Sequence, residues 1–194
     1  LLEKKNYSAL EYLKKRGLNL ETIKNFEIGF VPNSEGSFNQ LSKKYSEEDL
    51  IRSGLFYKNE KREVFVDRFY SRVIFPINNL SEETIAFGGR IINNSKLAKY
   101  INSPETEFYK KGKILFNLDK VKKLRSSFNE VLIVEGYLDV ISLYSLGIKN
   151  VIANSGTSFT ENQILLLWNF FSNLIFCMDG DESGKKAANR MAEK

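Results

Sequence analysis

Carboxylates follow two of the predicted strands in the C-terminal part of the chain, at the point where each strand ends. Glu135 comes directly after the apolar run Val131–Val134. Asp179 and Asp181 come at the end of a later run, Leu174–Met178. Parallel strands joined by helical crossovers end along one edge of a sheet. We therefore expect these three side chains to lie close together, which costs free energy unless a cation or a proton compensates for their charge.

A fourth carboxylate, and the absence of some residue types, limit the kinds of catalysis and metal binding that this chain can support. Asp139 lies one helical turn after Glu135, where it either joins the acidic group or serves the helix N-terminus alone. The chain has no histidine and a single cysteine, which excludes Ser-His-Asp and Cys-His catalysis, histidine-bound zinc and a disulfide framework. Carboxylate oxygens without imidazole or thiolate partners favour Mg²⁺ or Mn²⁺, which commonly bridges carboxylates to phosphates.

Each of these short motifs also has an ordinary structural interpretation. A Glu-Gly pair after a strand is usually a turn, and Asp-Gly-Asp occurs in loops and in some calcium sites. A functional site is favoured because these motifs all occur at the same place, the ends of parallel strands. Cys177 and Trp168 are interpreted as core residues.

Positive charge is concentrated between residues 90 and 125. Ten basic side chains there face three acidic ones, so this segment carries +7 while the whole chain carries +5. For Arg90, Lys99 and Lys111, set among glycine, tyrosine, asparagine and proline, the pattern favours binding of a polyanion. The remaining basic residues near the end of this segment are more typical of a solvated helix: Lys120, Lys122, Lys123 and Arg125.

The elements that must position these residues divide near Ser126–Asn129. Before this point the pattern predicts helices over 7–16, 20–25 and after Ser46, a loop over 33–39, and strands over 64–69, 72–77 and 84–92. Gly88-Gly89 interrupts the last strand, which indicates a bulge or a close approach to the backbone. After the division, apolar strands alternate with helices over 131–194, with a capping box at Thr160, as is typical of a parallel α/β sheet. The longest apolar run, Ile164–Trp168, is far too short to span a membrane.

Taken together, these motifs resemble known families. The order strand, Glu135-Gly136, helix, strand, helix, strand, Asp179-Gly-Asp181 resembles the Toprim domain of topoisomerases, bacterial primases and some nucleases. The upstream blocks resemble the catalytic core of DnaG-type primases: Tyr12–Leu18, Ile28–Pro32, Asp67–Ile77, Ile85–Arg90 and Lys99–Thr106. The resemblance implies an α/β fold with a mixed α+β N-terminal subdomain over residues 1–127, which includes the β-rich basic segment. A Toprim-type parallel α/β sheet, truncated at its C-terminal end, is expected over residues 128–194.

The resemblance also implies a function: synthesis of short RNA primers on single-stranded DNA during replication, by metal-dependent nucleotidyl transfer. Carried over by position, the metal-binding acids are Glu135, Asp179 and Asp181, with Asp139 also catalytic. Tyr100 is expected either to stack on a base or to pack in the core. The residues expected to hold nucleotide or template are Arg16, Arg90, Lys99, Tyr100, Asn102, Lys111 and Lys113.

Further expectations follow from the same resemblance. The cofactor is Mg²⁺ or Mn²⁺, and zinc belongs only to a module that this chain lacks. The partners are single-stranded DNA, ribonucleoside triphosphates and the RNA primer, with the replicative helicase bound through a domain absent here. A cytoplasmic, bacterial monomer is expected, without membrane contact, and the chain, as a core fragment, need not be active alone. The alternatives are DNA cleavage by a Toprim nuclease or topoisomerase-like enzyme, and a non-catalytic DNA-binding module.

Overall fold

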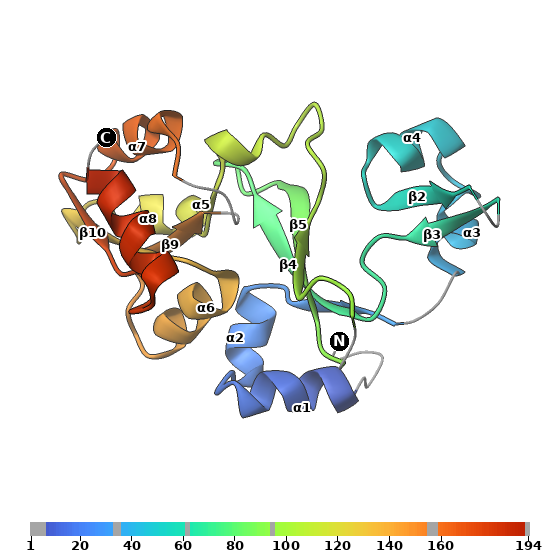
Figure 1. The fold of residues 1–194 in the computed structure, drawn as a ribbon, viewed down its shortest axis with the longest axis horizontal. Helices are drawn as coiled ribbons and strands as arrows, with labels where there is room; N and C mark the ends of the chain where they lie inside the picture. The colour runs from blue at the N-terminus through green and yellow to red at the C-terminus, as the bar shows by residue number, and fades with distance from the viewer. Residues whose placement is uncertain (1–6, 33–35, 61–62, 94–95, 155–158, 193–194) are drawn as a thin grey trace.

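The computed structural model of the chain describes residues 7–32, 36–60, 63–93, 96–154 and 159–192. Figure 1 shows three groups of elements side by side: a C-terminal sheet with its helices, a central sheet, and a small lobe built on a two-stranded hairpin. The central sheet has the strand order β1-β4-β5-β6 and the C-terminal sheet the order β10-β8-β9-β7. None of the described helices is both long and apolar enough to cross a membrane.

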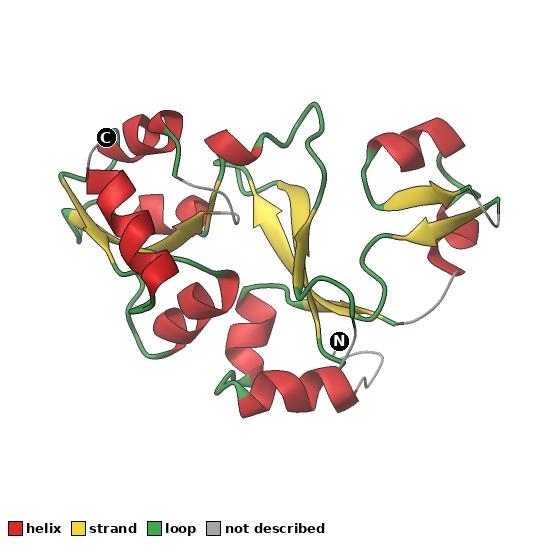
Figure 2. Ribbon diagram, viewed as in Figure 1, coloured by secondary structure: helices red, strands yellow, loops and turns green. Residues whose placement is uncertain are grey.

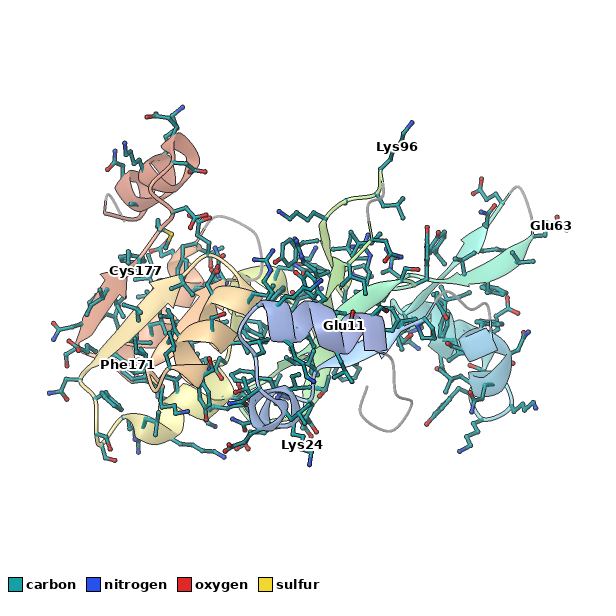
Figure 3. All side chains as sticks on the ribbon, turned by 90° about the horizontal axis from the view of Figure 1, so that it is seen from below. Glu11, Lys24, Glu63, Lys96, Phe171 and Cys177 are labelled. Carbon is teal, nitrogen blue, oxygen red and sulfur yellow. The ribbon has the colours of Figure 1, made fainter. Side chains whose placement is uncertain are left out.

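Two helices begin the described chain, α1 (Tyr7–Lys15) and α2 (Leu20–Asn25), as predicted. Gly17 between them has φ +81, a conformation that favours glycine at a helix end. The side chain of Asn19 caps α2 by accepting the backbone N–H of Thr22 at 2.8 Å. Leu13 and Ile23 are buried in the same core cluster as the central strands. In Figure 3, Glu11 on α1 lies over the middle of the molecule, between the ends marked by Cys177 and Glu63.

The central sheet is antiparallel throughout. Its strands are β1 (Gly29–Val31), β4 (Arg72–Asn78), β5 (Thr84–Ile91) and β6 (Tyr100–Asn102). The register places Arg90 opposite Tyr100 and Gly88 opposite Asn102. The last residues of β5, which carry the predicted basic group, are therefore cross-strand neighbours of β6.

The small lobe contains two elements that the sequence did not predict, α3 (Gly36–Leu41) and β2 (Phe56–Asn59). Its other elements are α4 (Glu47–Arg52) and β3 (Val64–Asp67). The predicted loop over 33–39 is wrong from residue 36 onward, where α3 forms. Phe38 explains this, because its ring centroid lies 4.1 Å from that of Phe65 and 5.3 Å from that of Phe56. Such contacts with distant strands override the local preference of a glycine- and asparagine-rich segment. The predicted cap of α4 is confirmed, since Ser46 Oγ accepts the N–H of Asp49 at 3.1 Å.

Short elements connect the central sheet to the C-terminal one: η1 (Lys111–Lys113), β7 (Leu115–Phe116), α5 (Leu118–Val121) and η2 (Lys122–Leu124). The predicted helix around residues 120–125 is confirmed in α5 and η2. β7 pairs antiparallel with β9 and so belongs to the C-terminal sheet.

The C-terminal part has the predicted alternation of strand and helix. Its elements are β8 (Glu130–Val134), α6 (Tyr137–Ser145), β9 (Val151–Asn154), α7 (Glu161–Trp168), β10 (Asn173–Phe176) and α8 (Glu182–Ala192). β8 pairs in parallel with both β9 and β10, and Figure 2 shows helices on either side of these strands. Successive residues of β9 enter different cores, Val151 and Ala153 the one beneath α6 and Ile152 the one beneath α7. Burial on both faces explains why the strand is apolar without alternation.

Two residues interpreted as core are exposed instead. Cys177 follows β10 and is exposed, and Trp168 at the end of α7 is 52% exposed. β10 is an edge strand of the described sheet, paired with β8 alone, and every second residue of β10 is exposed. An apolar sequence therefore does not ensure burial at this edge.

Candidate active site

The ends of β8 and β10 meet, as the carboxylate pattern predicts. The two strands pair in parallel up to Ile133 and Phe176, and Cys177 extends the ladder by donating its N–H to the carbonyl of Ile133 at 2.8 Å. Beyond the ladder, the backbone N–H of Asp179 donates to Oε1 of Glu135 at 2.9 Å. This bond holds the Glu135 carboxylate against the first residue of the Asp-Gly-Asp turn.

The other two carboxylates of this edge cap helices. Asp139 Oδ2 accepts the N–H of Gly136 at 3.0 Å at the start of α6, and Asp181 Oδ1 accepts the N–H of Gly184 at 2.8 Å in α8. Desolvation raises the pKa of the Asp139 carboxyl. The nearby carboxylate of Asp179 raises it further, whereas the Gly136 N–H and the Arg16 guanidinium oppose the shift. Asp139 is therefore within electrostatic reach of both Asp179 and Arg16. We refer to Glu135, Asp139, Asp179 and Asp181 as the acidic turn.

The acidic turn contains carboxylate oxygens of the kind that bind magnesium, but these oxygens are not arranged around a common position. In the described part of the chain, no three or more Asp, Glu, His or Cys side chains are arranged to hold a metal ion. The hydrogen bonds above explain this, because Asp139 and Asp181 each use an oxygen to cap a helix. Neither of the ion pairs found between described residues, Arg52–Glu107 and Lys123–Glu82, includes a carboxylate of the acidic turn, and Arg16 acts on Asp139 through its charge. Neighbouring carboxylates that are not ion-paired fit a hard divalent cation in donor chemistry.

A cationic and aromatic cluster forms where β5 and β6 meet α1. Arg90 is 7% exposed, and its Nε donates to the hydroxyl of Tyr12 at 2.7 Å. Its guanidinium carbon lies 4.7 Å from the ring centroid of Tyr100 and 5.8 Å from that of Tyr12. Arg16, one turn along from Tyr12, lies 5.6 Å from the Tyr12 ring. We call Tyr12, Arg16, Arg90 and Tyr100 the basic cluster; Tyr12 was not predicted, although it lies in the Tyr12–Leu18 block.

The basic cluster and the acidic turn are neighbours. Desolvation raises the pKa of the Tyr100 phenol, and four neighbouring groups modify it. The guanidinium groups of Arg90 and Arg16 lower this pKa, and the phenol of Tyr12 and the carboxylate of Asp139 raise it. Asp139, in the first turn of α6, is thus within electrostatic range of the basic cluster. Ring contacts through Tyr12 and Tyr100 hold Arg16 and Arg90 together in that cluster.

Asn102 connects the same two groups through a hydrogen bond. The hydroxyl of Tyr137, the first residue of α6, donates to Asn102 Oδ1 at 2.7 Å. Gly88 lies beneath this contact: a Cβ atom on it would come within 2.5 Å of the Tyr137 ring. A Cβ on Gly89 would come within 2.6 Å of Phe69. The predicted close approach to this glycine pair is confirmed, and Tyr137 is a second site-forming residue that the sequence reasoning missed.

The three predicted lysines lie outside these contacts. Lys99 is exposed, just before β6, and its side chain makes no contact within the described residues. Lys111 and Lys113 lie in η1, where the Lys111 N–H donates to Glu105 Oε1 at 3.0 Å and its carbonyl accepts from Gln163 at 3.0 Å. η1 is therefore fixed against α7, and no interaction among the described residues joins its lysines to the acidic turn.

Arg72 is a further residue that the sequence reasoning missed. It is 3% exposed in β4, and burial lowers the pKa of its guanidinium. Its nitrogens donate to the carbonyls of Ala98 at 2.8 Å, Lys99 at 3.3 Å and Gly89 at 3.4 Å. The sequence signal that could have identified Arg72 is a charged residue at the start of an otherwise apolar strand. Arg72 fixes the segment that carries Lys99 and Tyr100.

We expect Arg72→Met to destabilise the fold by about 1–3 kcal/mol, because it removes three hydrogen bonds that a buried guanidinium donates to backbone carbonyls. Affinity for single-stranded DNA should fall as well, since the segment before β6 is released. Urea unfolding and fluorescence anisotropy with a labelled oligonucleotide measure the two effects. The matched control is Arg68→Met, which removes a bond to the Gly54 carbonyl in the small lobe and should leave affinity unchanged. Destabilisation without loss of affinity would limit Arg72 to a role in folding.

Known families match both parts of the chain. Residues 1–122 match the family described as DNA primase catalytic core, N-terminal domain. Residues 132–194 match the Toprim-like family.

Individual relatives agree with these family matches. The chain is 39% identical to the DNA primase of Enterococcus faecalis over 189 residues, covering 94% of this chain and 30% of that protein. A solved DNA primase domain from Pseudomonas aeruginosa is 37% identical with a TM-score of 0.90, covering 97% of this chain and 59% of that one. A DnaG primase catalytic domain bound to ssDNA is 39% identical with a TM-score of 0.87, covering 96% of this chain and 58% of that one. The chain therefore spans about a third of the length of the curated relatives it matches.

Proposed function

This chain belongs to the bacterial DnaG-type DNA primase family, and from that membership we propose that it forms part of a catalytic core that synthesises short RNA primers on single-stranded DNA. The observation that carries the proposal is the hydrogen bond from Tyr137, which lies between Glu135 and Asp139 in sequence, to Asn102 in β6, the strand that carries Tyr100, because it brings the acidic turn beside the basic cluster. Nucleotidyl transfer needs both groups, since cations hold phosphates and carboxylates hold the metal ions that assist the reaction. In this proposal, primer synthesis takes place in the bacterial cytoplasm, as a step of DNA replication.

We propose that Glu135, Asp179 and Asp181 hold Mg²⁺ or Mn²⁺. When bound, such an ion lowers the pKa of an attacking hydroxyl and neutralises charge on phosphate. Asp181 can take part through Oδ2, because only its Oδ1 accepts the Gly184 N–H that caps α8. Glu135 is already held against the Asp179 backbone, so its orientation is set before any ion arrives. In this proposal Asp139 adjusts the local charge from its cap at α6.

The basic side of the site would bind phosphate and base. Arg90 and Arg16 supply guanidinium groups for phosphate oxygens, and Tyr100, 42% exposed, offers a ring for base stacking. In the proposed reaction the primer 3′-hydroxyl attacks the α-phosphate of the bound nucleotide, and pyrophosphate leaves. Lys99, Lys111 and Lys113 would extend the cationic surface along template or triphosphate.

The proposal includes the arrangement of the chain and its partners. Residues 1–127 form the core subdomain that binds template and nucleotide, and residues 128–194 form the Toprim subdomain, to which β7 contributes a short strand. The partners are single-stranded DNA, ribonucleoside triphosphates and the RNA primer, and a solved relative bound to ssDNA supports the first of these. We also propose that the protein is a monomer and that it contacts the replicative helicase through another domain.

Cleavage of DNA by a Toprim nuclease is the less favoured alternative. The match of residues 1–122 to the primase core is specific to primases, whereas an acidic edge alone is shared with nucleases. Incubating the chain with a single-stranded template, labelled ribonucleotides and Mn²⁺ separates the two. Primase activity gives labelled RNA that requires the template, and a nuclease gives shortened template. Template cleavage without incorporation would overturn the proposal.

We expect Lys99→Ala to weaken binding of single-stranded DNA and to reduce its salt dependence. Each phosphate contact on a single strand contributes about 0.7 to the slope of log affinity against log salt concentration. Loss of the exposed Lys99 should therefore lower that slope by about 0.7, measured by anisotropy titrations at several salt concentrations. Lys44→Ala, which removes an exposed lysine from the small lobe, is the matched control. An unchanged slope for Lys99→Ala would exclude Lys99 from the DNA contact.

A further inference from the structure

Arg90 is buried beside two phenol rings and lacks an acceptor for one of its nitrogens. Its guanidinium carbon lies 4.7 Å from the Tyr100 ring centroid and 5.8 Å from that of Tyr12, and the Tyr12 hydroxyl accepts a hydrogen bond from Nε at 2.7 Å. Nη1 is fully buried and has no hydrogen-bond partner among the described residues. A buried donor without an acceptor is costly, and more so on a charged group. An arginine kept in this state is suited to a ligand that supplies the acceptor.

A second buried arginine in the same sheet provides the contrast. Arg72, also on the central sheet, donates to the carbonyls of Gly89, Ala98 and Lys99 and so is paired by the protein itself. The two side chains lie on adjacent strands at similar burial, 3% for Arg72 and 7% for Arg90. The unpaired Nη1 is therefore particular to Arg90, and burial alone does not explain it.

Tyr12 is the group that sets the direction of that nitrogen. A guanidinium is planar, so the hydrogen bond at Nε, together with the nearby Tyr100 ring, restricts the orientation of both terminal nitrogens. Tyr12 can provide this support because α1 is anchored: its neighbour Leu13 is fully buried, and the Tyr12 ring packs against the same core cluster. Arg16, the residue after α1, lies 5.6 Å from the Tyr12 ring centroid.

Resting on the proposed function, we infer that Tyr12 is a positioning residue that holds the Arg90 guanidinium so that Nη1 donates to a phosphate oxygen. Because Nη1 is covered in the free structure, this donation requires that the neighbouring, partly exposed Tyr100 ring move aside when the phosphate binds. The phosphate belongs to a nucleoside triphosphate or to the template backbone, which present the same acceptor. Tyr12 itself acts through Arg90 and does not need to touch the phosphate. Its hydroxyl accounts for the effect, since the ring would also be supplied by phenylalanine.

The test removes that hydroxyl and keeps the ring. Binding of Mg²⁺–ATP by calorimetry and of labelled oligothymidylate by anisotropy are measured for the wild type and for Tyr12→Phe, so that the two arms distinguish the phosphate sources. We expect a loss of about tenfold in at least one arm, the scale of one hydrogen bond to a charged group. The melting temperature should also fall, because Arg90 Nε loses its acceptor, so affinities are compared at a temperature where both proteins are fully folded. Tyr144→Phe is the matched control, because Tyr144 is a half-buried phenol packed on the same core cluster.

A double-mutant cycle with Arg90→Ala distinguishes positioning from a direct contact. If Tyr12 acts through Arg90, adding Tyr12→Phe to Arg90→Ala causes no further loss of affinity. A further loss as large as in the wild-type background would overturn the inference, as would wild-type affinity of Tyr12→Phe in both arms. Those results leave the proposed function standing if Arg90→Ala itself weakens binding. If the wild type binds neither probe, or if Arg90→Ala changes nothing, the proposed function and the inference fail together.

Discussion

Asp179→Asn is expected to reduce ribonucleotide incorporation by about a thousandfold, because a bound metal ion contributes several kcal/mol to charge stabilisation in the transition state. Asp179 is the best-placed member of the acidic turn for this role. It is exposed, its backbone fixes Glu135, and its own carboxylate caps no helix in the described structure. Incorporation of labelled ribonucleotide on a single-stranded template gives the rate.

Stability measurements test the same substitution without relying on turnover. Removing one of several neighbouring carboxylates relieves repulsion, so the metal-free variant should melt above the metal-free wild type. Mn²⁺ should raise the melting temperature of the wild type, since a ligand that binds only the native state stabilises it, and should not raise that of Asp179→Asn. Stability and activity would then change in opposite directions, which a purely structural residue does not produce.

The pKa of Asp139 provides a third readout with a defined sign. Because the Asp179 carboxylate raises that pKa, Asp179→Asn should lower it, measured by NMR titration of the Asp139 carboxyl. The control is Glu182→Gln, which removes an exposed carboxylate at the start of α8. The assignment of Asp179 to the site would be wrong if Asp179→Asn retained incorporation and the Mn²⁺ effect while Glu182→Gln lost them.

The sequence predicted the acidic turn because the relevant rule is local. A residue at or just beyond the end of a parallel strand lies at the carboxyl edge of the sheet wherever that sheet packs. Glu135 directly after β8 and Asp179 three residues after β10 follow this rule, and the hydrogen bond between them joins residues 44 apart in sequence. The capping box at Thr160 is local in the same sense and is confirmed by the paired bonds with Gln163, at 3.0 and 3.2 Å.

Residues that depend on long-range packing were not predictable. Nothing near Tyr12 in sequence indicates that its hydroxyl contacts Arg90, 78 residues away. Helix α3 forms because Phe38 finds aromatic partners on β2 and β3, which no local propensity describes. The exposure of Cys177 depends on its following an edge strand, and strand order is a property of the assembled sheet. The glycine pair is intermediate: the sequence indicated a close approach, and only the fold identifies Tyr137 as the group that approaches.

Gly88→Ala is expected to destabilise the fold by about 1–3 kcal/mol, the usual cost of overpacking, and to weaken DNA binding. The added methyl would lie 2.5 Å from Cε2 and 2.8 Å from Cζ of Tyr137. The ring cannot easily yield, because it stacks on Phe75 at 5.6 Å and meets Phe116 edge-on at 4.8 Å. Any shift also moves Asn102, which is hydrogen-bonded to the Tyr137 hydroxyl.

A control in the same sheet separates this clash from the general effect of replacing a glycine. On Gly29 in β1 a Cβ would lie 3.7 Å from Ile74, an ordinary contact, so Gly29→Ala should be neutral or stabilise the fold by up to about 1 kcal/mol through the unfolded chain. Combining Gly88→Ala with Tyr137→Ala should remove the penalty of the added methyl, because the opposing ring is gone. Urea unfolding of the wild type, Gly88→Ala, Tyr137→Ala and the double variant gives the coupling energy. An equal penalty for Gly88→Ala with and without the Tyr137 ring would show that Tyr137 is not what Gly88 accommodates. If the coupling is found, the missing side chain of Gly88 is what leaves room for the Tyr137 ring against β5, and so lets the Tyr137 hydroxyl bind Asn102 in β6.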